Sequence, residues 1–228
     1  MLMEKRHAIP EILSRQRLFR GLDASELGRL ADATYEYRIG KNETVFQKGD
    51  IPKGLHLVIA GQVKLFLPSA NGAEMIVHMA GAGDAFGEEA MLPNKPCPLA
   101  AQANRDTLLM VIEKRALGDV MKRNCDFSNM MMAHLCERLC ALVDSMETCV
   151  QLNSSQRVVH YLTQYAPVEA DSFDLELNAN KQTIASQLNL APETFSRVLN
   201  RLSKEGYIQV KGRNITLNNL SFLRSYAG

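Results

Sequence analysis

A pair of short amphipathic segments over residues 180–208 constrains the fold of this chain more than any other feature. Apolar residues at helical spacing predict a first helix over Lys181–Leu188. Asn189–Ala191 are then expected to form a tight turn. Pro192 suits the first position of a second helix, where its missing N–H would have no partner, and Gly206 is typical of the residue after a helix end. The spacing therefore predicts a helix-turn-helix.

The exposed face of the predicted second helix carries side chains that suit base recognition. Glu193, Ser196 and Arg197 lie near its N-terminal end, the part of such a helix that enters a major groove. Glutamate accepts a hydrogen bond from cytosine N4, arginine donates two to guanine, and serine can contact several bases. The alternative is an ordinary polar surface helix, against which the following segment argues. The residues placed for phosphate contacts are Lys181, Thr183, Thr194, Lys211 and Arg213.

A basic hairpin is predicted directly after the two helices. Two short runs with β-branched residues, Tyr207–Val210 and Asn214–Leu217, flank the turn Lys211-Gly212-Arg213. From Lys181 to the C-terminus there are seven lysines and arginines against two acidic residues, a net charge of +5, whereas the whole chain carries +1. A basic module in a nearly neutral chain is typical of duplex DNA binding. Together these features predict a winged helix-turn-helix.

The texture of the N-terminal part changes from helical to strand-like. Residues 1–35 have helical apolar spacing, with Asp23 as an N-cap and Glu26 three residues later as in a capping box. Over residues 35–112, short apolar runs alternate with glycines, which predicts a sandwich or jelly roll. Asn71-Gly72 predicts a hairpin turn. The clearest candidate strands are Thr44–Gln47, Leu55–Ala60, Gln62–Leu67, Met75–Met79, Ala100–Ala103 and Leu108–Ile112.

A long helix is predicted from about Asp126 to Cys149, after a shorter one over Glu113–Arg123. Apolar residues recur along it at alternating steps of three and four, the spacing of a coiled-coil seam. A second apolar set, Phe127, Met131 and Val143, is expected to pack on the roll. The seam predicts a homodimer, and the alternative is a helix buried within its own domain. The predicted dimer interface comprises Met132, Leu135, Leu139, Leu142, Met146 and Cys149.

Composition excludes several classes of protein. The chain has 228 residues, of which 46% are hydrophobic and 22% charged, as in globular proteins. The N-terminus lacks the apolar region of a signal peptide, no apolar run matches a membrane span, and five cysteines fit a reducing compartment. We therefore expect a cytoplasmic protein with no membrane partner.

No Ser/His/Asp or paired-carboxylate signature stands out, so we expect no enzyme. The rival from another class is a cupin-type metalloprotein, which needs clustered histidine and carboxylate ligands. His56 and His78 stand 22 residues apart, each without a second histidine nearby. Metal analysis would separate this rival from a DNA-binding protein.

Several motifs recur along the chain in a defined order: Gly40, Gly49-Asp50, Gly61-Gln62-Val63, Gly83-Asp84, Phe86-Gly87-Glu88 and Glu193-Thr194-Phe195-Ser196-Arg197. With these motifs the chain resembles the CRP/FNR family of bacterial transcription regulators over nearly its whole length. The resemblance implies an α+β fold with a β-roll sensor domain (a double-stranded β-helix or jelly roll) over residues 1–124, a dimerisation helix over 125–150 and a winged helix-turn-helix over 151–228. It also implies a homodimer that binds double-stranded DNA and contacts RNA polymerase.

The motif for cyclic nucleotides is incomplete. In CRP-like binders a Gly-Glu pair is followed by an Arg-Ser that grips the cyclic phosphate. Here Gly87-Glu88 is present, but the matching place is Pro96-Cys97-Pro98-Leu99, and no cationic residue lies between Lys95 and Arg105. A buried phosphate without a cationic partner is costly, so a cAMP-responsive regulator is the alternative within the family. There is no cysteine before Cys97, which argues against an iron–sulfur cluster of the FNR type.

The remaining pattern resembles the Dnr, NnrR and HcpR branches, which respond to nitric oxide or related nitrogen oxides, in several cases through haem. This resemblance implies nitrosative-stress sensing with haem as cofactor, and His134 is the candidate axial ligand. The histidine pair that precedes Leu-Phe in some Dnr proteins is replaced here by Gln16-Arg17, which departs from their haem site. The expected effector pocket comprises Phe86, Gly87, Glu88, Met91, Leu92, Met131, His134 and Leu135.

The start of the predicted recognition helix sets the expected operator. It begins Pro192-Glu193-Thr194, without the arginine that precedes Glu-Thr in CRP-like helices. Resemblance to FNR then implies half-sites of the TTGA type and a palindromic operator TTGA…TCAA, with half-site centres one turn, or about 34 Å, apart. Arg197 is expected to read the guanine, Glu193 a cytosine and Ser196 a thymine.

Overall fold

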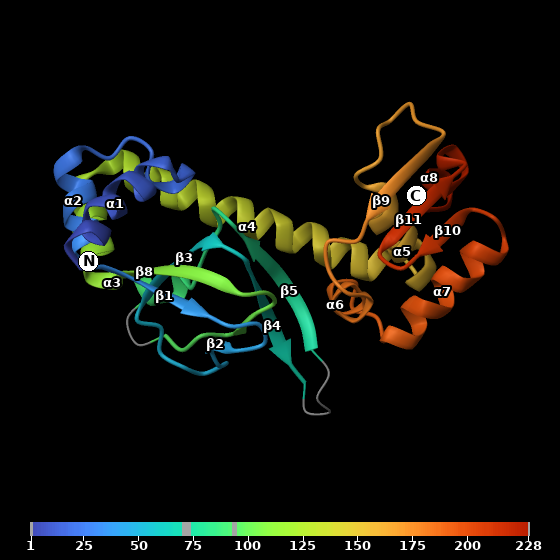
Figure 1. The fold of residues 1–228 in the computed structure, drawn as a ribbon, viewed down its shortest axis with the longest axis horizontal. Helices are drawn as coiled ribbons and strands as arrows, with labels where there is room; N and C mark the ends of the chain where they lie inside the picture. Colours follow the sequence, from blue (N-terminus) through green and yellow to red (C-terminus); the bar gives the residue numbers. More distant parts are fainter. Residues whose placement is uncertain (1, 70–73, 93–94, 228) are drawn as a thin grey trace. The chain divides into compact units, whose positions relative to one another are not determined.

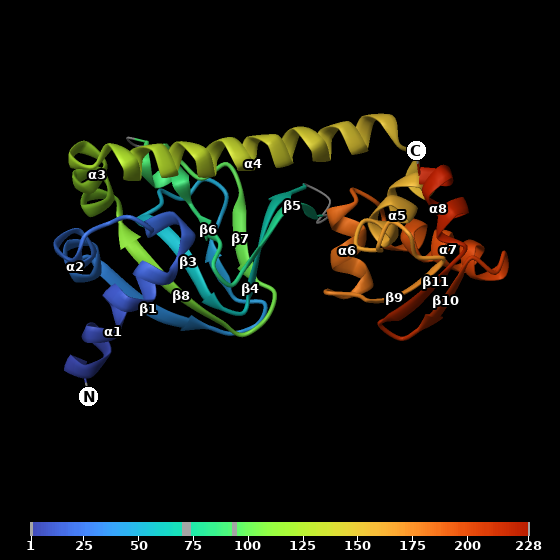
Figure 2. The same ribbon diagram turned by 90° about the horizontal axis from the view of Figure 1, so that it is seen from above.

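The computed structural model describes residues 2–69, 74–92 and 95–227. It forms two compact units, residues 1–140 and 141–228, whose elements are drawn in Figures 1 and 2. The boundary lies inside the long helix α4, Cys125–Gln151, whereas the sequence predicted limits after residues 124 and 150. Among the described residues, no helix combines the length and the apolar character that crossing a membrane requires.

The first unit begins with helices. These are α1 (Leu2–Arg15), the short 3-10 helix η1 (Arg17–Phe19) and α2 (Ala24–Asp32). The predicted capping box of α2 is confirmed, because the Asp23 carboxylate accepts from the Glu26 N–H at 2.8 Å and the Glu26 carboxylate accepts from the Asp23 N–H at 3.0 Å. The buried core beside these helices includes Leu13, Phe19, Leu30, Leu55, Met110, Ile112, Leu117, Phe127 and Met131.

Two four-stranded antiparallel sheets form the roll. The first has the order β1-β8-β3-β6, with bounds Thr34–Ile39, Thr107–Glu113, Gly54–Ala60 and Ala85–Phe86. The second has the order β2-β7-β4-β5, with bounds Thr44–Phe46, Ala100–Ala103, Gln62–Pro68 and Glu74–Gly81. Val58, Leu65, Phe86 and Leu109 belong to one buried cluster that draws on both sheets. The predicted β-roll is confirmed.

All six predicted strands are present, with ends that differ from the prediction by at most two residues. Two strands of the roll were not predicted: β1, in which Glu36 and Arg38 interrupt the apolar residues, and β6, which is only two residues long. Asn71-Gly72 lies outside the described residues, but the strands on either side of it, β4 and β5, pair antiparallel.

Gly61 makes the tight connection between β3 and β4. Its φ is +95°, a conformation that side chains rarely adopt. A Cβ at this position would lie 2.5 Å from both the Asp106 carbonyl oxygen and the Thr107 hydroxyl. Only glycine therefore fits here without moving the neighbouring strand.

Helix α3 (Lys114–Arg123) leads into α4. Phe127 and Met131 are buried as predicted, and the rings of Phe127 and Phe19 stack at 5.8 Å. Val143, the third residue of that set, is 54% exposed, in contrast to the buried Phe127 and Met131.

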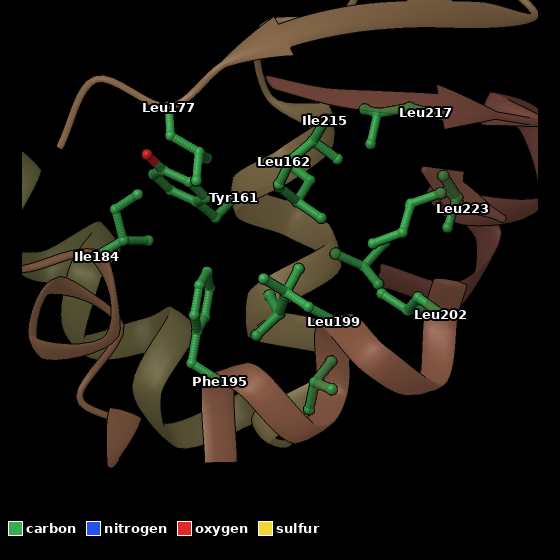
Figure 3. Packing of buried hydrophobic residues seen from close by; sticks show 14 of the residues in the cluster. Tyr161, Leu162, Leu177, Ile184, Phe195, Leu199, Leu202, Ile215, Leu217 and Leu223 are labelled. Atoms are coloured by element: carbon green, nitrogen blue, oxygen red, sulfur yellow. The ribbon is translucent and has the colours of Figure 1, made fainter. Parts of the chain in front are cut away.

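The second unit is built on a three-stranded sheet with the order β10-β11-β9. Its helices are α5 (Ser154–Thr163), α6 (Lys181–Gln187), α7 (Pro192–Lys204) and α8 (Leu220–Ala227). Its strands are β9 (Ser172–Glu176), β10 (Ile208–Lys211) and β11 (Asn214–Asn218). Figure 3 shows the apolar core, to which Leu162 contributes from α5, Phe195 and Leu199 from α7, and Ile215 from β11. The predicted winged helix-turn-helix is confirmed, with β9 as an additional strand.

Candidate nucleic-acid interface and sensor pocket

Local hydrogen bonds shape the start of α6 and the turn that leads into α7. The Asn180 side chain accepts from the Thr183 N–H at 2.7 Å and starts α6. In the turn, Asn189 has a φ of +51°, which asparagine tolerates better than most residues, and the Leu190 N–H donates to the Ala185 carbonyl at 2.9 Å. Pro192 occupies the first turn of α7 as predicted. The turn is therefore set by residues that suit its unusual backbone.

Helix α7 has one buried face and one exposed face. Phe195 and Leu199 anchor it in the core. Glu193, Ser196 and Arg197 are all exposed on the other side, so the structure brings the three predicted base-reading residues to one surface. The only bond found for the Arg197 guanidinium in the described chain is a 3.3 Å contact with the Thr194 hydroxyl. That contact is long, so the side chain is available to a ligand.

The five predicted phosphate-binding residues differ in availability. Lys181 and Lys211 are exposed, and Thr194 is half-buried. Thr183 is only 9% exposed, which leaves its hydroxyl little room for a phosphate. The Arg213 guanidinium donates to the Leu177 carbonyl at 2.7 and 3.2 Å, so this arginine braces the hairpin instead of extending freely into solvent. Lys211 ends β10 and lies before the two-residue turn, Gly212-Arg213.

In the first unit, the Glu88 carboxylate is held by two side chains of α4. His134 Nε2 lies 2.9 Å and Arg138 Nη1 lies 3.3 Å from Glu88 Oε1. Arg138 also donates to the Ala85 carbonyl at 3.2 Å. Burial alone would raise the pKa of Glu88, but the hydrogen bond with His134 and the charge of Arg138 outweigh it and hold that pKa below its ordinary value. The sequence analysis missed Arg138, since nothing local marks a residue 50 positions from Glu88 as its partner.

The eight predicted effector-pocket residues do not share one environment. Phe86 is fully buried in the interior of the roll, while Met131 is buried in the core beside the N-terminal helices. Leu92 and Leu135 are about half exposed. Among their side chains, only those of Glu88 and His134 are hydrogen-bonded to each other in the described structure. Gly87, with a φ of +84°, starts the 3-10 helix η2 (Glu88–Met91), which contains Met91.

The place that matches the phosphate-gripping Arg-Ser is tied into the roll. Cys97 exchanges backbone hydrogen bonds with Gly49 and Asp50, at 2.9 and 2.8 Å. Its thiol is buried, and burial, together with Glu89 and Asp50, raises the pKa of Cys97 to about 11. This segment therefore supplies an inert thiol where a cyclic phosphate would need a cation.

A pocket that the sequence did not reveal lies elsewhere on the roll. Its volume is about 540 Å³, and its walls include Tyr35, Tyr37, Phe46 and His56. Burial lowers the pKa of His56 to about 4, so the imidazole is neutral at pH 7. His56 Nδ1 is buried and makes no hydrogen bond of good geometry in the described structure. These residues come from three strands, β1, β2 and β3, so no sequence motif announces the pocket.

Within the described ranges, no three His, Cys, Asp or Glu side chains converge in a way that could hold the metal ion of a cupin-type protein. His56 instead stacks on Phe86, with ring centroids 4.9 Å apart.

Comparison with known proteins assigns both units. Residues 37–124 match the cyclic nucleotide-binding domain, and residues 156–226 match the Crp-like helix-turn-helix domain. The fumarate and nitrate reduction regulatory proteins of Escherichia coli K12 and Salmonella typhimurium are each 27% identical over 194 residues, which cover 83% of this chain and 77% of theirs.

Solved structures share the fold. FixK2 from Bradyrhizobium japonicum has a TM-score of 0.71 at 23% identity, covering 86% of this chain and 98% of its own. A CooA mutant from Carboxydothermus hydrogenoformans has a TM-score of 0.75 at 21% identity, covering 96% of this chain and 95% of its own. With two matching domains in the family order and FNR relatives along most of its length, the chain belongs to the CRP/FNR family of transcription regulators.

Proposed function

We propose that two copies of this chain form a regulator that binds a palindromic operator of the TTGA…TCAA type. The observation that carries the proposal is the exposed face of α7, where Glu193, Ser196 and Arg197 project from a helix anchored by Phe195 and Leu199. In each half-site Arg197 reads the guanine, Glu193 a cytosine and Ser196 a thymine. Lys181 and Lys211 contact phosphates beside them, whereas Thr183 and Arg213 support the backbone around the site.

The seam of α4 supports the homodimer. In a single subunit Met132 is 56%, Leu139 61% and Met146 66% exposed. Apolar side chains at this spacing need a partner that excludes water, and a second copy of the same helix supplies one with matching spacing. A two-fold pair of subunits presents two recognition helices to two half-sites of a palindrome. The full predicted interface of Met132, Leu135, Leu139, Leu142, Met146 and Cys149 is retained in the proposal.

Haem bound through His134 does not fit the residues present. His134 Nε2 is hydrogen-bonded to Glu88 Oε1, so only Nδ1 of this ring could serve as an axial ligand. The apolar walls that a haem slot needs are split between Phe86 and Met131 in separate cores and the half-exposed Leu92. A response to nitric oxide stays a prediction of the sequence resemblance, with no haem ligand assigned.

A second candidate is a small anionic effector such as a cyclic nucleotide. The specific observation in its favour is Arg138, which brings a guanidinium to Glu88 although the sequence lacks a cation at the usual place. To bind a phosphate, Arg138 would exchange its contact with Glu88 for one with the ligand. Titration calorimetry with cAMP tests this candidate, because Arg138→Gln should remove the binding of an anion.

A contact with RNA polymerase is also part of the proposal. The Arg224 guanidinium donates to the carbonyls of Ala166, Pro167 and Val168, and so fixes a turn on which Val168 is 86% exposed. A fixed apolar turn at the surface suits a protein contact. Val168→Asp should lower or raise transcription from a target promoter while leaving operator affinity unchanged.

The operator proposal is tested by fluorescence anisotropy with a labelled TTGA…TCAA duplex and a duplex in which both guanines are replaced. We expect saturable binding to the first duplex and at least tenfold weaker binding to the second. Sedimentation equilibrium should give a dimer, and Leu139→Lys should give a monomer with weaker operator binding. Equal affinity for both duplexes would contradict the proposed reading of the half-site.

A further inference from the structure

Arg157 bonds to two separate parts of the second unit through one guanidinium. It lies in the first turn of α5, where its Nε donates to the Leu152 carbonyl at 3.1 Å. Its Nη1 donates to the Leu188 carbonyl at 2.9 Å and to the Asn189 carbonyl at 3.3 Å. Leu152 directly follows α4, and Leu188 and Asn189 follow α6. One side chain therefore connects the end of α4 to the turn of the helix-turn-helix.

The chemistry of these bonds is specific to arginine. The last carbonyls of a helix have no partner within the helix, and a cation near them also interacts favourably with the helix dipole. Arg157 meets this need for α6 through Nη1 while its Nε faces the end of α4. A guanidinium holds several donors in one plane at fixed angles, whereas the single ammonium of lysine cannot reach in both directions at once.

The segment between α4 and α5 is bonded at successive residues. The Leu152 N–H still donates to the Thr148 carbonyl at 3.2 Å, so the helical pattern of α4 reaches this residue. The Asn153 side chain accepts from the N–H groups of Ser155 and Gln156, and the Gln156 side chain accepts from the Asn153 N–H. This capping box makes residues 152–156 a stiff elbow.

The body of α5 is locked to the recognition helix by apolar packing. Val158 and Leu162 on α5 belong to the same buried cluster as Phe195 and Leu199 on α7. The backbone of Arg157 is thus fixed with respect to α7, and its side chain adds the link to the turn and to Leu152.

We propose that Arg157 is a positioning residue for operator recognition, which makes the end of α4, the turn and α7 move as one body. The proposal rests on the proposed operator binding, because its effect is measured as operator affinity. A displacement at the end of α4 then passes to the recognition helix, and the segment 151–155 acts as a rigid joint.

The test compares Arg157→Gln with Arg224→Gln. Arg224 is a matched control, since it also ties a turn through backbone carbonyls, at residues 166–168, but has no bond to the helix-turn-helix in the described structure. We expect Arg157→Gln to bind the TTGA…TCAA duplex about tenfold more weakly than the natural chain, the size of one lost charged hydrogen bond, and Arg224→Gln to bind it equally well. The dependence of affinity on salt should stay the same, because no phosphate contact is removed.

Hydrogen exchange without DNA gives a second readout that does not depend on operator binding. In Arg157→Gln the amide of Leu190, which donates to Ala185, should exchange faster than in the natural chain, and in Arg224→Gln it should not. Arg157→Lys should follow Arg157→Gln, because charge alone does not restore both bonds.

Three results would overturn the proposal: equal losses of operator affinity in the two glutamine variants, full function of Arg157→Lys, or a reduced salt dependence that makes Arg157 a phosphate contact. If Arg157→Gln does not fold, the operator affinity of Arg157→Lys and the hydrogen exchange of its Leu190 amide still test the proposal. Failure of the natural chain to bind the operator would instead reject the proposed function, and the exchange measurement would still test the link made by Arg157.

Discussion

The exposed face of α7 and the charged cluster around Glu88 differ in whether their polar side chains have partners within the chain. On α7, Glu193, Ser196 and Arg197 are exposed, and the bond found for Arg197 is a long one to Thr194. In the first unit, Glu88 is largely buried and bonded to His134 and Arg138. The polar groups of the first surface are left to solvent or a ligand, whereas those of the second site are already satisfied by the chain itself.

This difference shows which family motifs indicate a role from their residue types alone. The motif on α7 meets the same chemical partner, the edges of base pairs, in every member that reads DNA, so residue types alone indicate its role. The Gly87-Glu88 motif is proposed to face an effector, and its role depends on which side chains of α4 lie opposite it. Here α4 provides one imidazole and one guanidinium.

The largest expected effect is a loss of folding stability at low pH, caused by the buried His56 of the roll. His56 is neutral in the folded protein because burial lowers its pKa to about 4. The unfolded chain binds a proton below about pH 6.5 and the folded chain does not, so stability is complete above that pH and falls as pH drops from about 6.5 to 4. Between pH 7.5 and 4.5 the loss from His56 should be about 2–3 kcal/mol.

Urea unfolding of the natural chain and of His56→Gln at both pH values measures this loss, because groups common to the two proteins cancel in the difference. If the pH dependence is the same in both, His56 accepts a proton in the folded roll and the contrast between the two regions weakens.

The next largest effect is a loss of operator affinity on changing Arg197, on the exposed face of α7. Arg197→Ala should cost about 1–3 kcal/mol of binding free energy on the TTGA…TCAA duplex and relax the choice of base at the guanine. Anisotropy titrations with all four bases at that position measure both quantities. The fold should be unaffected, since Arg197 is exposed and outside the core. Equal weakening on every duplex would show that Arg197 contacts a phosphate and does not read the base.

Glu88→Gln should produce a smaller change. The variant removes the negative charge between His134 and Arg138, which are both about one-fifth exposed, so solvent compensates part of the loss and we expect about 1 kcal/mol of destabilisation at pH 7. Because the pKa of Glu88 is lowered in the folded state, this contribution is present above about pH 4.3 and is lost as pH falls further. Equal stability of the two proteins at pH 7 and at about pH 3 would show that the cluster stores no stability and is free to serve a ligand.

The smallest effect separates two basic residues of the hairpin. Lys211→Gln should lower the slope of log affinity against log salt by about one, because one phosphate contact is lost. Arg213→Gln should leave that slope unchanged and lower the melting temperature, because its guanidinium is bonded to the Leu177 carbonyl. A reversed result would place Arg213 at the phosphates and Lys211 outside the interface.

The sequence predicted the parts of the molecule that local patterns determine. The capping box at Asp23, the helix start at Pro192 and the exposed seam of α4 depend on neighbours within one or two turns, and each is present. Strand β1 was missed because its charged residues alternate with tyrosines in a pattern that does not look buried.

The sequence could not predict partners that are distant along the chain. Arg213 was assigned to phosphate because it lies at a basic turn, but its guanidinium meets a carbonyl 36 residues away. The pairing of Glu88 with His134 and the pocket beside His56 likewise depend on how separate strands and helices meet. Such contacts follow from tertiary packing, which periodicity does not encode.

If two subunits pair through the apolar stripe on α4, as proposed, operator occupancy becomes a function of the amount of protein. A palindrome is filled by two joined subunits, and while most subunits are separate the number of pairs rises with the square of their concentration. Occupancy then climbs more steeply than the supply of the chain, so a modest change in its synthesis or degradation crosses a threshold. The side chains of Leu139 and Met146 would in this way set a dosage-sensitive switch in addition to any that an effector controls.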